Sequence, residues 1–344
     1  MPLAVQYAGA HSIVTAHVDR RPPGPGEVEI APAYTGICGT DLHIFHGDMD
    51  GRVSRPAVLG HEMSGRISAI GEGVTGLSPG DPVTVMPLRS CGACAACRGG
   101  HQHICQSLDF IGVDSAGSLQ ERWTVPAGVV VALPPDIDLA AAALVEPTAV
   151  AVHDVRRAGV SEGETVVVVG AGPIGVLIAL LARRAGGSVL VVEPDTYRRD
   201  FISRLGFRTV DPGDEDPNAT VEEWTEGAGA CVAFEVSGAA AGLANAVQVL
   251  GVRGRLCLVA IHPRPQSVDL HRIFWRELTL VGARLYERRD FAEAVELIHD
   301  GTVPTEAMIS TIVPLDGAAE AFAAMESGHG VMKVLVGTGT GEAR

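Results

Sequence analysis

The stretch Thr165–Gly175 reads TVVVVGAGPIG and decides the fold of this chain. Its first five residues are a β-branched run typical of a buried parallel strand, and the apolar, helix-like stretch Ile174–Arg184 follows. The spacing Gly-x-Gly-x-x-Gly between them predicts a dinucleotide site, because it permits a tight turn, a close approach to pyrophosphate and close helix packing. The residues assigned to this cofactor loop are Gly170, Gly172, Pro173, Ile174 and Gly175.

The residues that follow repeat the same alternation of strand and helix. β-branched runs lie at Ser188–Val192, Cys231–Val236, Arg255–Ala260 and Leu278–Val281. Helix-like stretches separate them, so the pattern predicts a doubly wound parallel sheet. The acidic segment 211–218 (DPGDEDPN) is interpreted as a solvated loop. The C-terminal tail is expected to hold one helix, Phe291–Asp300, and a final strand, Lys333–Val336.

The N-terminal part has a different character. Up to about residue 135, short strand-like runs such as Glu27–Ile30 and Pro82–Met86 are separated by the turn signals PGPG, GEG and SPGD. We therefore expect a β-rich domain followed by an α/β domain.

An acidic residue, Glu193, ends the strand after the glycine-rich loop. A carboxylate at this place accepts hydrogen bonds from the adenosine ribose diol and repels a 2′-phosphate, which favours NAD over NADP. Arg198 and Arg199 argue the other way, since arginine can also receive a 2′-phosphate. Both arginines could instead be surface positions on the next helix, and NAD remains the favoured cofactor.

Composition excludes several classes of protein. The net charge of -15 disfavours nucleic acid as a partner. Lys333 is the only lysine, which argues against Schiff-base and P-loop chemistry. The uncharged run Thr165–Ala182 is divided by its glycines and is not expected to span a membrane. The start MPLAVQYAGA lacks the features of a signal peptide, so we expect a cytoplasmic protein with reduced thiols.

Four of the seven cysteines, Cys91, Cys94, Cys97 and Cys105, lie within fifteen residues. Their spacing lets four sulfurs converge on one ion, and four thiolates form a closed structural zinc site without an open position. An iron–sulfur cluster is compatible with the same spacing, and a disulfide pair is disfavoured by the compartment. His101 and His103 are surplus to a complete sulfur shell and are expected to be exposed.

A second set of metal-ligand residues is spread along the chain: Cys38, His61, Glu62 and Glu146. A cysteine, a histidine and a carboxylate supply three ligands and leave one position open, as a catalytic zinc requires. At this wide spacing, a buried thiol among scattered polar residues is an equal alternative.

The order of these motifs carries a resemblance. GHE at 60–62, the four-cysteine lobe, EP at 146–147 and GAGPIG at 170–175 resemble the zinc-dependent medium-chain dehydrogenase/reductase family over essentially the whole chain. EPTAVAVH and LTLVGARLYERRDF are most similar to its polyol branch, which includes sorbitol and 2,3-butanediol dehydrogenases. The resemblance implies a GroES-like catalytic domain of residues 1–148 and 285–344, with a Rossmann NAD-binding domain, 149–284, inserted. It also implies an active site in the cleft between the domains and a homodimer or homotetramer.

Carried over to this sequence, the resemblance makes Cys38 and His61 zinc ligands. Glu146 stands where the alcohol dehydrogenase branch has a second cysteine, and Glu62 is placed at or near the metal. Which of the two glutamates binds zinc, and which holds its water, stays open.

The implied reaction is hydride transfer from a secondary alcohol, a polyol or vicinal diol, to NAD, giving a ketone. Zinc acts as the Lewis acid, Thr40 takes the hydroxyl proton and His43 delivers it to solvent. Asp41 is expected to orient His61. Thr40 could alternatively be a turn residue bonded to its own backbone.

Three other functions stay open at this stage. The chain could act on simple secondary or amino alcohols, or bind NAD without catalysis on the same fold. It could also be an interaction module whose four-cysteine lobe recognises a protein.

Overall fold

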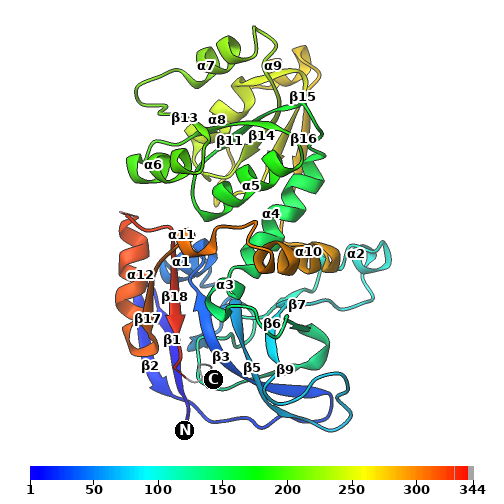
Figure 1. The fold of residues 1–344 in the computed structure, drawn as a ribbon, viewed down its shortest axis with the longest axis vertical. Coiled ribbons are helices and arrows are strands. Elements are labelled where there is room, and N and C mark those ends of the chain that lie inside the picture. The colour runs from blue at the N-terminus through cyan, green and yellow to red at the C-terminus, as the bar shows by residue number, and fades with distance from the viewer. Residues whose placement is uncertain (329, 340–344) are drawn as a thin grey trace. The chain divides into compact units, whose positions relative to one another are not determined.

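The computed structural model describes residues 1–328 and 330–339, and the chain divides into two compact units (Figure 1). Unit 1 comprises Met1–Glu146 and Glu287–Arg344, and unit 2 comprises Pro147–Tyr286. Helix α4 (Val145–Ala158) begins in unit 1 and continues into unit 2. None of the described helices is both long and apolar enough to cross a membrane.

Unit 2 is built on one sheet of six parallel strands in the order β13-β12-β11-β14-β15-β16. In chain order these are β11 (Thr165–Val169), β12 (Ser188–Val192), β13 (Arg208–Val210), β14 (Ala230–Glu235), β15 (Leu250–Leu258) and β16 (Thr279–Gly282). The order runs outward in both directions from β11 and β14, which confirms the predicted doubly wound parallel sheet.

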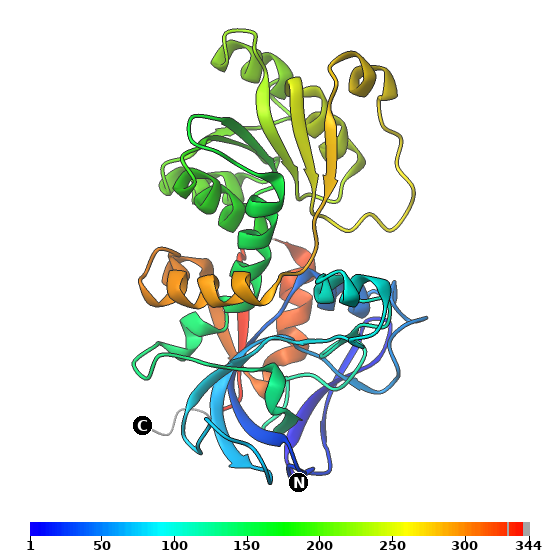
Figure 2. The same ribbon diagram turned by 90° about the vertical axis from the view of Figure 1, so that its right-hand side faces the viewer.

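Helices connect these strands and cover the sheet (Figures 1 and 2). They are α5 (Pro173–Arg184), α6 (Thr196–Arg204), α7 (Pro217–Trp224), α8 (Ala240–Gln248) and α9 (Leu270–Trp275). Helix α5 packs against β11 and β12, and α8 packs against β11, β14 and β15. The strands present buried aliphatic side chains such as Val167, Leu190 and Leu256 to these helices, which explains their almost continuous apolar sequence.

The sequence interpretation of 211–218 as a loop is wrong at its end. Asp216 is the N-cap of α7, its carboxylate accepts from Asn218 N at 3.0 Å, and Pro217 is the first helical residue. An aspartate followed by proline is a strong helix start, because the carboxylate satisfies a free N–H and proline needs none.

Unit 1 contains a seven-stranded sheet in the order β10-β6-β5-β3-β18-β17, with β9 paired to β3. In chain order its strands are β3 (Glu27–Gly36), β5 (Glu62–Ile70), β6 (Pro82–Val85), β9 (Trp123–Pro126), β10 (Val130–Ala132), β17 (Ile309–Pro314) and β18 (Lys333–Gly337). The C-terminal strand β18 pairs with β3, so the end of the chain completes the N-terminal sheet.

Smaller elements complete unit 1. β1 (Leu3–Gly9), β2 (Ser12–His17) and β4 (Ala57–Val58) form a three-stranded sheet, and β7 (Leu88–Arg89) pairs with β8 (Asp109–Phe110). The helices are α1 (Gly39–Phe45), α2 (Ala95–Arg98), α3 (Leu139–Ala142), α10 (Arg288–His299), α11 (Thr305–Met308) and α12 (Ala318–Ser327). Within the described residues, the tail thus holds three α-helices, α10, α11 and α12, where the sequence interpretation expected one.

Candidate active site and cofactor loop

Cys38, His61 and Glu62 come together in unit 1 because two strands end side by side. Strand β3 ends at Gly36, which pairs directly with Glu62 at the start of β5. Cys38 is the N-cap of α1, two residues beyond β3. One ligand atom from each of Cys38, His61 and Glu62 lies within 4.8 Å of the others. Both His61 and Glu62 are buried, so the group is shielded from bulk water.

Asp41 connects the helix start to the histidine. Its Oδ2 accepts from Cys38 N at 2.9 Å, and its Oδ1 lies 3.7 Å from His61 Nδ1. Burial acts to lower the pKa of His61, but Asp41, Cys38 and Glu146 together outweigh it and raise that pKa well above the usual value. Asp41 thus lies beside His61 without a hydrogen bond between Oδ1 and Nδ1, and its orienting role stays a prediction.

Asp41 Oδ1 and His61 Nδ1 are buried and have no hydrogen-bond partner. Buried polar atoms of this kind cost free energy unless a further group completes the arrangement. A thiol, an imidazole and a carboxylate that converge within 4.8 Å form a donor set that zinc prefers. The residues of this cluster therefore fit a zinc ion.

The only lysine of the chain contacts this cluster. Lys333 Nζ donates to Glu62 Oε2 at 2.6 Å, to Glu62 Oε1 at 2.9 Å and to Ile37 O at 3.2 Å. Burial alone would lower the pKa of Lys333, but the charges of Glu62 and Cys38 raise it. The sequence interpretation placed Lys333 in an apolar terminal strand and missed this role, because the contact depends on how distant strands pair.

Glu146 lies close to the same charges but outside the group of three. It is 3% exposed, and its negative charge acts to raise the pKa of both His61 and Lys333.

Thr40 and His43 lie three residues apart on α1 and therefore share one face of this helix. The imidazole of His43 is 34% exposed and its Nδ1 lies 3.2 Å from Asp48 Oδ2, so this end of the face meets solvent.

The four-cysteine lobe gathers its sulfurs as the spacing predicts. Cys91, Cys94, Cys97 and Cys105 each offer an Sγ within 4.8 Å of the other three. Cys94 Sγ is 3.5 Å from Cys97 Sγ and 3.8 Å from Cys105 Sγ. Zn–S bonds of about 2.3 Å in a tetrahedron separate the sulfurs by about 3.8 Å, so the cluster fits zinc.

Backbone amides of the lobe point at its sulfurs. Gln106 N and Cys97 N hold the pKa of the Cys94 thiol at about 6, well below its usual value. Burial raises the pKa of Cys97 to about 11. Four adjacent thiols can all be ionised at once only if a nearby cation offsets the repulsion between the thiolates. A metal ion supplies that positive charge. Contrary to expectation, His103 is buried, whereas His101 is exposed.

In unit 2, the cofactor loop has the geometry that its glycines predict. Gly170 has φ +108°, a conformation that side chains rarely adopt. A Cβ on Gly175 would lie 1.9 Å from Gly170 O, so only glycine lets helix α5 approach the loop. Gly172 is the N-cap of α5, with Pro173 and Ile174 in its first turn. Free N–H groups at such a helix start favour a pyrophosphate.

Glu193 is buried beneath this loop. Its Oε2 accepts from Ala171 N at 2.6 Å, and its Oε1 accepts from Asp195 N at 2.9 Å. Each carboxylate oxygen keeps further acceptor capacity for a ribose hydroxyl. Glu193 therefore shapes the loop in addition to any contact with the cofactor.

The two arginines near Glu193 differ in their partners. Arg199 pairs with Asp211 at 2.7 Å, which neutralises its charge. Arg198 Nη1 lies 3.9 Å from where a Cβ on Gly172 would stand, and its Nε is buried without a hydrogen-bond partner. Arg198 thus approaches the phosphate-binding turn, and Arg199 does not offer a free guanidinium.

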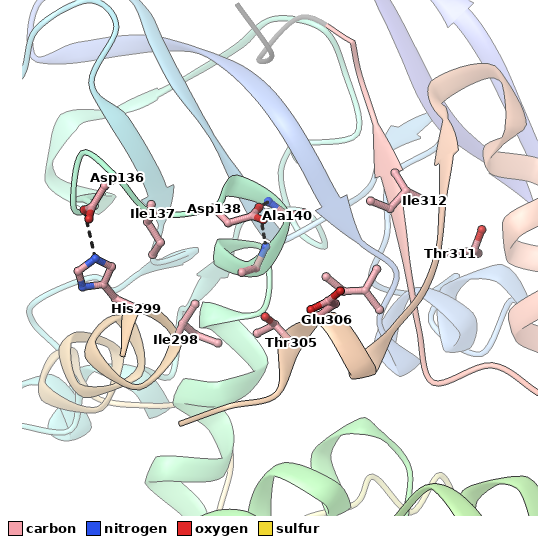
Figure 3. Close-up of a pocket in the computed structure, with 12 residues that line it drawn as sticks. Asp136, Ile137, Asp138, Ala140, Ile298, His299, Thr305, Glu306, Thr311 and Ile312 are labelled. Carbon is pink, nitrogen blue, oxygen red and sulfur yellow. Dashed lines mark hydrogen bonds and ion pairs between the residues drawn. The ribbon is translucent and has the colours of Figure 1, made fainter. Parts of the chain in front are cut away.

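A separate pocket of about 670 Å³ in unit 1 contains none of the predicted site residues (Figure 3). Two of its three acidic residues already serve the fold, since Asp136 lies 3.1 Å from His299 and Asp138 accepts from Ala140 N at 2.7 Å. We assign no ligand to this pocket.

Known proteins similar to this chain agree with this geometry. The family model described as alcohol dehydrogenase GroES-like domain matches residues 24–135, and that described as zinc-binding dehydrogenase matches residues 173–300. These matches agree with the predicted fold class, in which a Rossmann domain accompanies a GroES-like domain.

Individual relatives match between about four fifths and nearly all of the chain. A 2-dehydro-3-deoxy-L-galactonate 5-dehydrogenase of Pseudoalteromonas atlantica is 46% identical, covering 97% of this chain and 98% of its own length. An L-threonine 3-dehydrogenase of Pyrococcus abyssi is 37% identical over 79% of this chain and 80% of its own length. The crystal structure of 2R,3R-butanediol dehydrogenase from Bacillus subtilis superposes with a TM-score of 0.90 at 29% identity, covering 98% and 99% of the two chains.

Proposed function

Since this chain belongs to the polyol branch of the zinc-dependent medium-chain dehydrogenases, we propose that it oxidises a polyhydroxylated secondary alcohol to a ketone with NAD. It is an oxidoreductase acting on CH–OH groups, as its relatives are. The observation that carries the proposal is the convergence of Cys38, His61 and Glu62 within 4.8 Å. The relative at 46% identity makes a 2-dehydro-3-deoxy sugar acid the first substrate to try.

The two units divide the work in this proposal. Unit 1 holds the reacting alcohol through its metal site, and unit 2 holds the dinucleotide. When bound, zinc supplies a Lewis acid that lowers the pKa of an alcohol hydroxyl, and NAD supplies the hydride acceptor. A second zinc in the four-cysteine lobe stabilises the fold of that lobe and takes no part in the reaction.

Cys38, His61 and Glu62 hold the catalytic zinc in this proposal. Glu62 is preferred over Glu146 because its carboxylate belongs to the convergent group. Glu146 then holds the water or alcohol at the open position. Metal content tests this choice, since Glu62→Gln should lose zinc at this site whereas Glu146→Gln should keep it and lose activity.

Thr40 and His43 provide the proton path. Their common face on α1 begins two residues from Cys38 and ends at the partly exposed His43 imidazole. Thr40 accepts the proton of the alcohol and His43 passes it to water. Replacing Thr40 by valine removes the hydroxyl at nearly constant volume and should lower turnover more than affinity for NADH.

NAD is the proposed cofactor in preference to NADP. Glu193 is buried at the adenosine end of the loop, where its charge would repel a 2′-phosphate. The ion pair between Arg199 and Asp211 removes one of the two arginines that could have received such a phosphate. Arg198 is then left to contact the pyrophosphate.

We also propose that the chain forms a homo-oligomer through the edge of the unit 2 sheet. Strand β16 has one strand neighbour, and Leu270, Phe274 and Trp275 of α9 are each more than 70% exposed. A second copy can pair its own β16 about a two-fold axis and cover both apolar helices. Light scattering should find a dimer or tetramer that Trp275→Glu dissociates.

The thiolates of the four-cysteine lobe need a reducing compartment, which supports a cytoplasmic location.

An amino-alcohol dehydrogenase is the second candidate, because a threonine dehydrogenase is 37% identical. Turnover of NAD with a panel of sugar acids, polyols, vicinal diols and threonine decides between them. No turnover with the zinc-loaded protein on any of these alcohols would favour a binding protein without catalysis.

A further inference from the structure

A buried polar cluster lies at the carboxyl ends of two central strands of unit 2. Glu235 is the last residue of β14, and its Oε1 accepts from Ser237 N at 2.9 Å, Ser237 Oγ at 2.5 Å and Gly238 N at 3.0 Å. Its Oε2 lies 2.8 Å from His262 Nε2. The Glu235 side chain is completely buried and that of His262 is 15% exposed. None of the site residues discussed above belongs to this cluster.

The hydrogen bonds of Glu235 determine the tautomer of His262. Glu235 Oε1 already accepts three donors, and its Oε2 accepts a hydrogen bond from His262 Nε2. With its hydrogen on Nε2, the imidazole of His262 presents Nδ1 as an acceptor. Nδ1 is buried and has no hydrogen-bond partner. An unpaired buried acceptor costs about 1–3 kcal/mol, which a donor from a ligand would recover.

The position of His262 relative to the sheet identifies the ligand. Dinucleotides bind across the crevice at the carboxyl ends of a doubly wound sheet, where the strand order reverses. Here that point lies between β11 and β14, and a Cβ on Gly170 would stand 3.1 Å from Ser237 N. The cluster thus adjoins the pyrophosphate-binding turn.

The two halves of the sheet bind the two halves of the cofactor. Glu193 and Arg198, beyond β12, occupy the adenosine half. His262 follows β15, on the opposite side of the reversal, where the nicotinamide riboside must lie. Val259 N and Ala260 N both donate to Glu235 O, at 3.0 and 3.1 Å, and thereby fix the start of the segment that carries His262.

We propose that His262 is a cofactor-contacting residue whose Nδ1 accepts a hydrogen bond from the nicotinamide riboside half of NAD, with Glu235 orienting the ring. The inference rests on the proposed dinucleotide binding. Two groups of this half can donate to Nδ1: the carboxamide N–H and a ribose hydroxyl. Nδ1 is covered in the free protein, so the proposal requires a small local movement of the exposed chain neighbours Ile261 and Pro263 when the cofactor enters.

Titration calorimetry with three ligands tests the proposal on the intact, zinc-loaded protein. ADP lacks the nicotinamide riboside, ADP-ribose adds the second ribose, and NADH adds the nicotinamide. His262→Gln keeps a polar group toward Glu235 and removes the Nδ1 acceptor. It should weaken NADH binding about 5- to 30-fold, which corresponds to one lost hydrogen bond, and leave ADP binding unchanged. His262→Asn places an amide oxygen where Nδ1 stands and should retain NADH affinity within about threefold.

The ligands also separate the two donors. An equal loss for ADP-ribose and NADH assigns the bond to the ribose, and a loss confined to NADH assigns it to the carboxamide. His17→Gln, at the exposed end of strand β2 in unit 1, is the matched control and should change none of the three affinities. NADH affinity unchanged in His262→Gln overturns the proposal, as does an equal loss of ADP affinity, which would indicate a structural role. If the wild-type protein binds none of the three ligands, the dinucleotide function itself fails.

Discussion

The ammonium of Lys333 and the carboxylate of Glu62 form a buried ion pair, with Nζ at 2.6 and 2.9 Å from the two carboxylate oxygens. Strand β3 lies between β18, which carries Lys333, and β5, which carries Glu62. Its residue Gly36 pairs with Glu62 on one side and with Leu335 on the other. A Cβ at Gly36 would lie 2.3 Å from Glu62 Oε2, so the absent side chain gives the carboxylate its path across β3. The C-terminal strand is thereby tied to the candidate zinc site.

Removal of the ammonium leaves a buried carboxylate without its countercharge. Lys333→Met should therefore lower the free energy of unfolding by about 3–5 kcal/mol, as measured by urea denaturation of the zinc-free protein, in which no metal ion compensates the Glu62 carboxylate. The double variant with Glu62→Gln should lose less than the sum of the two single losses. Arg253→Met breaks the exposed pair with Glu277 and should change stability by at most about 1 kcal/mol. A loss no larger than this control in Lys333→Met would show that the pair is not important for the fold.

Two separate metal sites predict two zinc ions per chain. Elemental analysis should find two in the wild-type protein, and one each in Cys38→Ser and Cys94→Ser. Cys38→Ser should abolish turnover and keep NADH affinity, because the cofactor loop lies in the other unit. Cys94→Ser should lower the temperature of unfolding through loss of the lobe's metal. A single zinc in the wild-type protein would contradict one of the two assignments.

Much of the fold and the cofactor loop could be predicted from sequence because the deciding signals are local. The strand, turn and helix of 165–184 are contiguous, and each glycine has a steric reason within the same segment. The four cysteines are also close in sequence, so their convergence followed from spacing alone. Helix α7 was missed although Asp216 and Pro217 mark its start, because the acidic composition of the segment was given more weight than its capping pattern.

Contacts across the sheets could not be predicted in this way. Lys333 and Glu62 are 271 residues apart, and their contact requires β18 to lie beside β3. His262 meets Glu235 only because β15 is the neighbour of β14 in the strand order. Periodicity identifies strands but does not give the order of strands in a sheet, so these pairs needed the structure.

Asp154 on α4 should make stability depend on pH. Both its carboxylate oxygens are buried without a hydrogen-bond partner, and burial raises its pKa well above the usual value. In the folded protein it stays neutral up to this raised pKa, whereas it ionises in the unfolded chain above about pH 4. Its contribution is therefore fully present below about pH 4 and is lost as pH rises toward the raised pKa.

Asp154→Asn removes this titration. Relative to the wild-type protein, the variant should gain about 1–3 kcal/mol of stability between pH 5 and pH 8, in urea denaturation at both values. Exposed Asp200→Asn should show no such divergence. A variant less stable than the wild type at pH 8 would indicate that the carboxylate is charged and paired.

Glu193 should determine the choice of cofactor. Glu193→Ala removes a charge that repels a 2′-phosphate and an acceptor for the ribose, so kcat/KM for NAD relative to NADP should fall about 10- to 100-fold. Exposed Glu222→Ala should leave that ratio unchanged. An equal decline with both cofactors would show that Glu193 supports the loop through Ala171 and Asp195 alone.

The central claim is that Cys38, His61 and Glu62 hold a zinc at which a secondary alcohol is oxidised by NAD. The most direct measurement is NADH formation by the zinc-loaded wild-type protein and by Cys38→Ser, with sugar acids, polyols and vicinal diols, followed by identification of the ketone. We predict turnover by the wild-type protein on at least one of these alcohols and none by Cys38→Ser, which should still bind NADH. Undiminished turnover in a Cys38→Ser protein shown to lack this zinc would contradict the account.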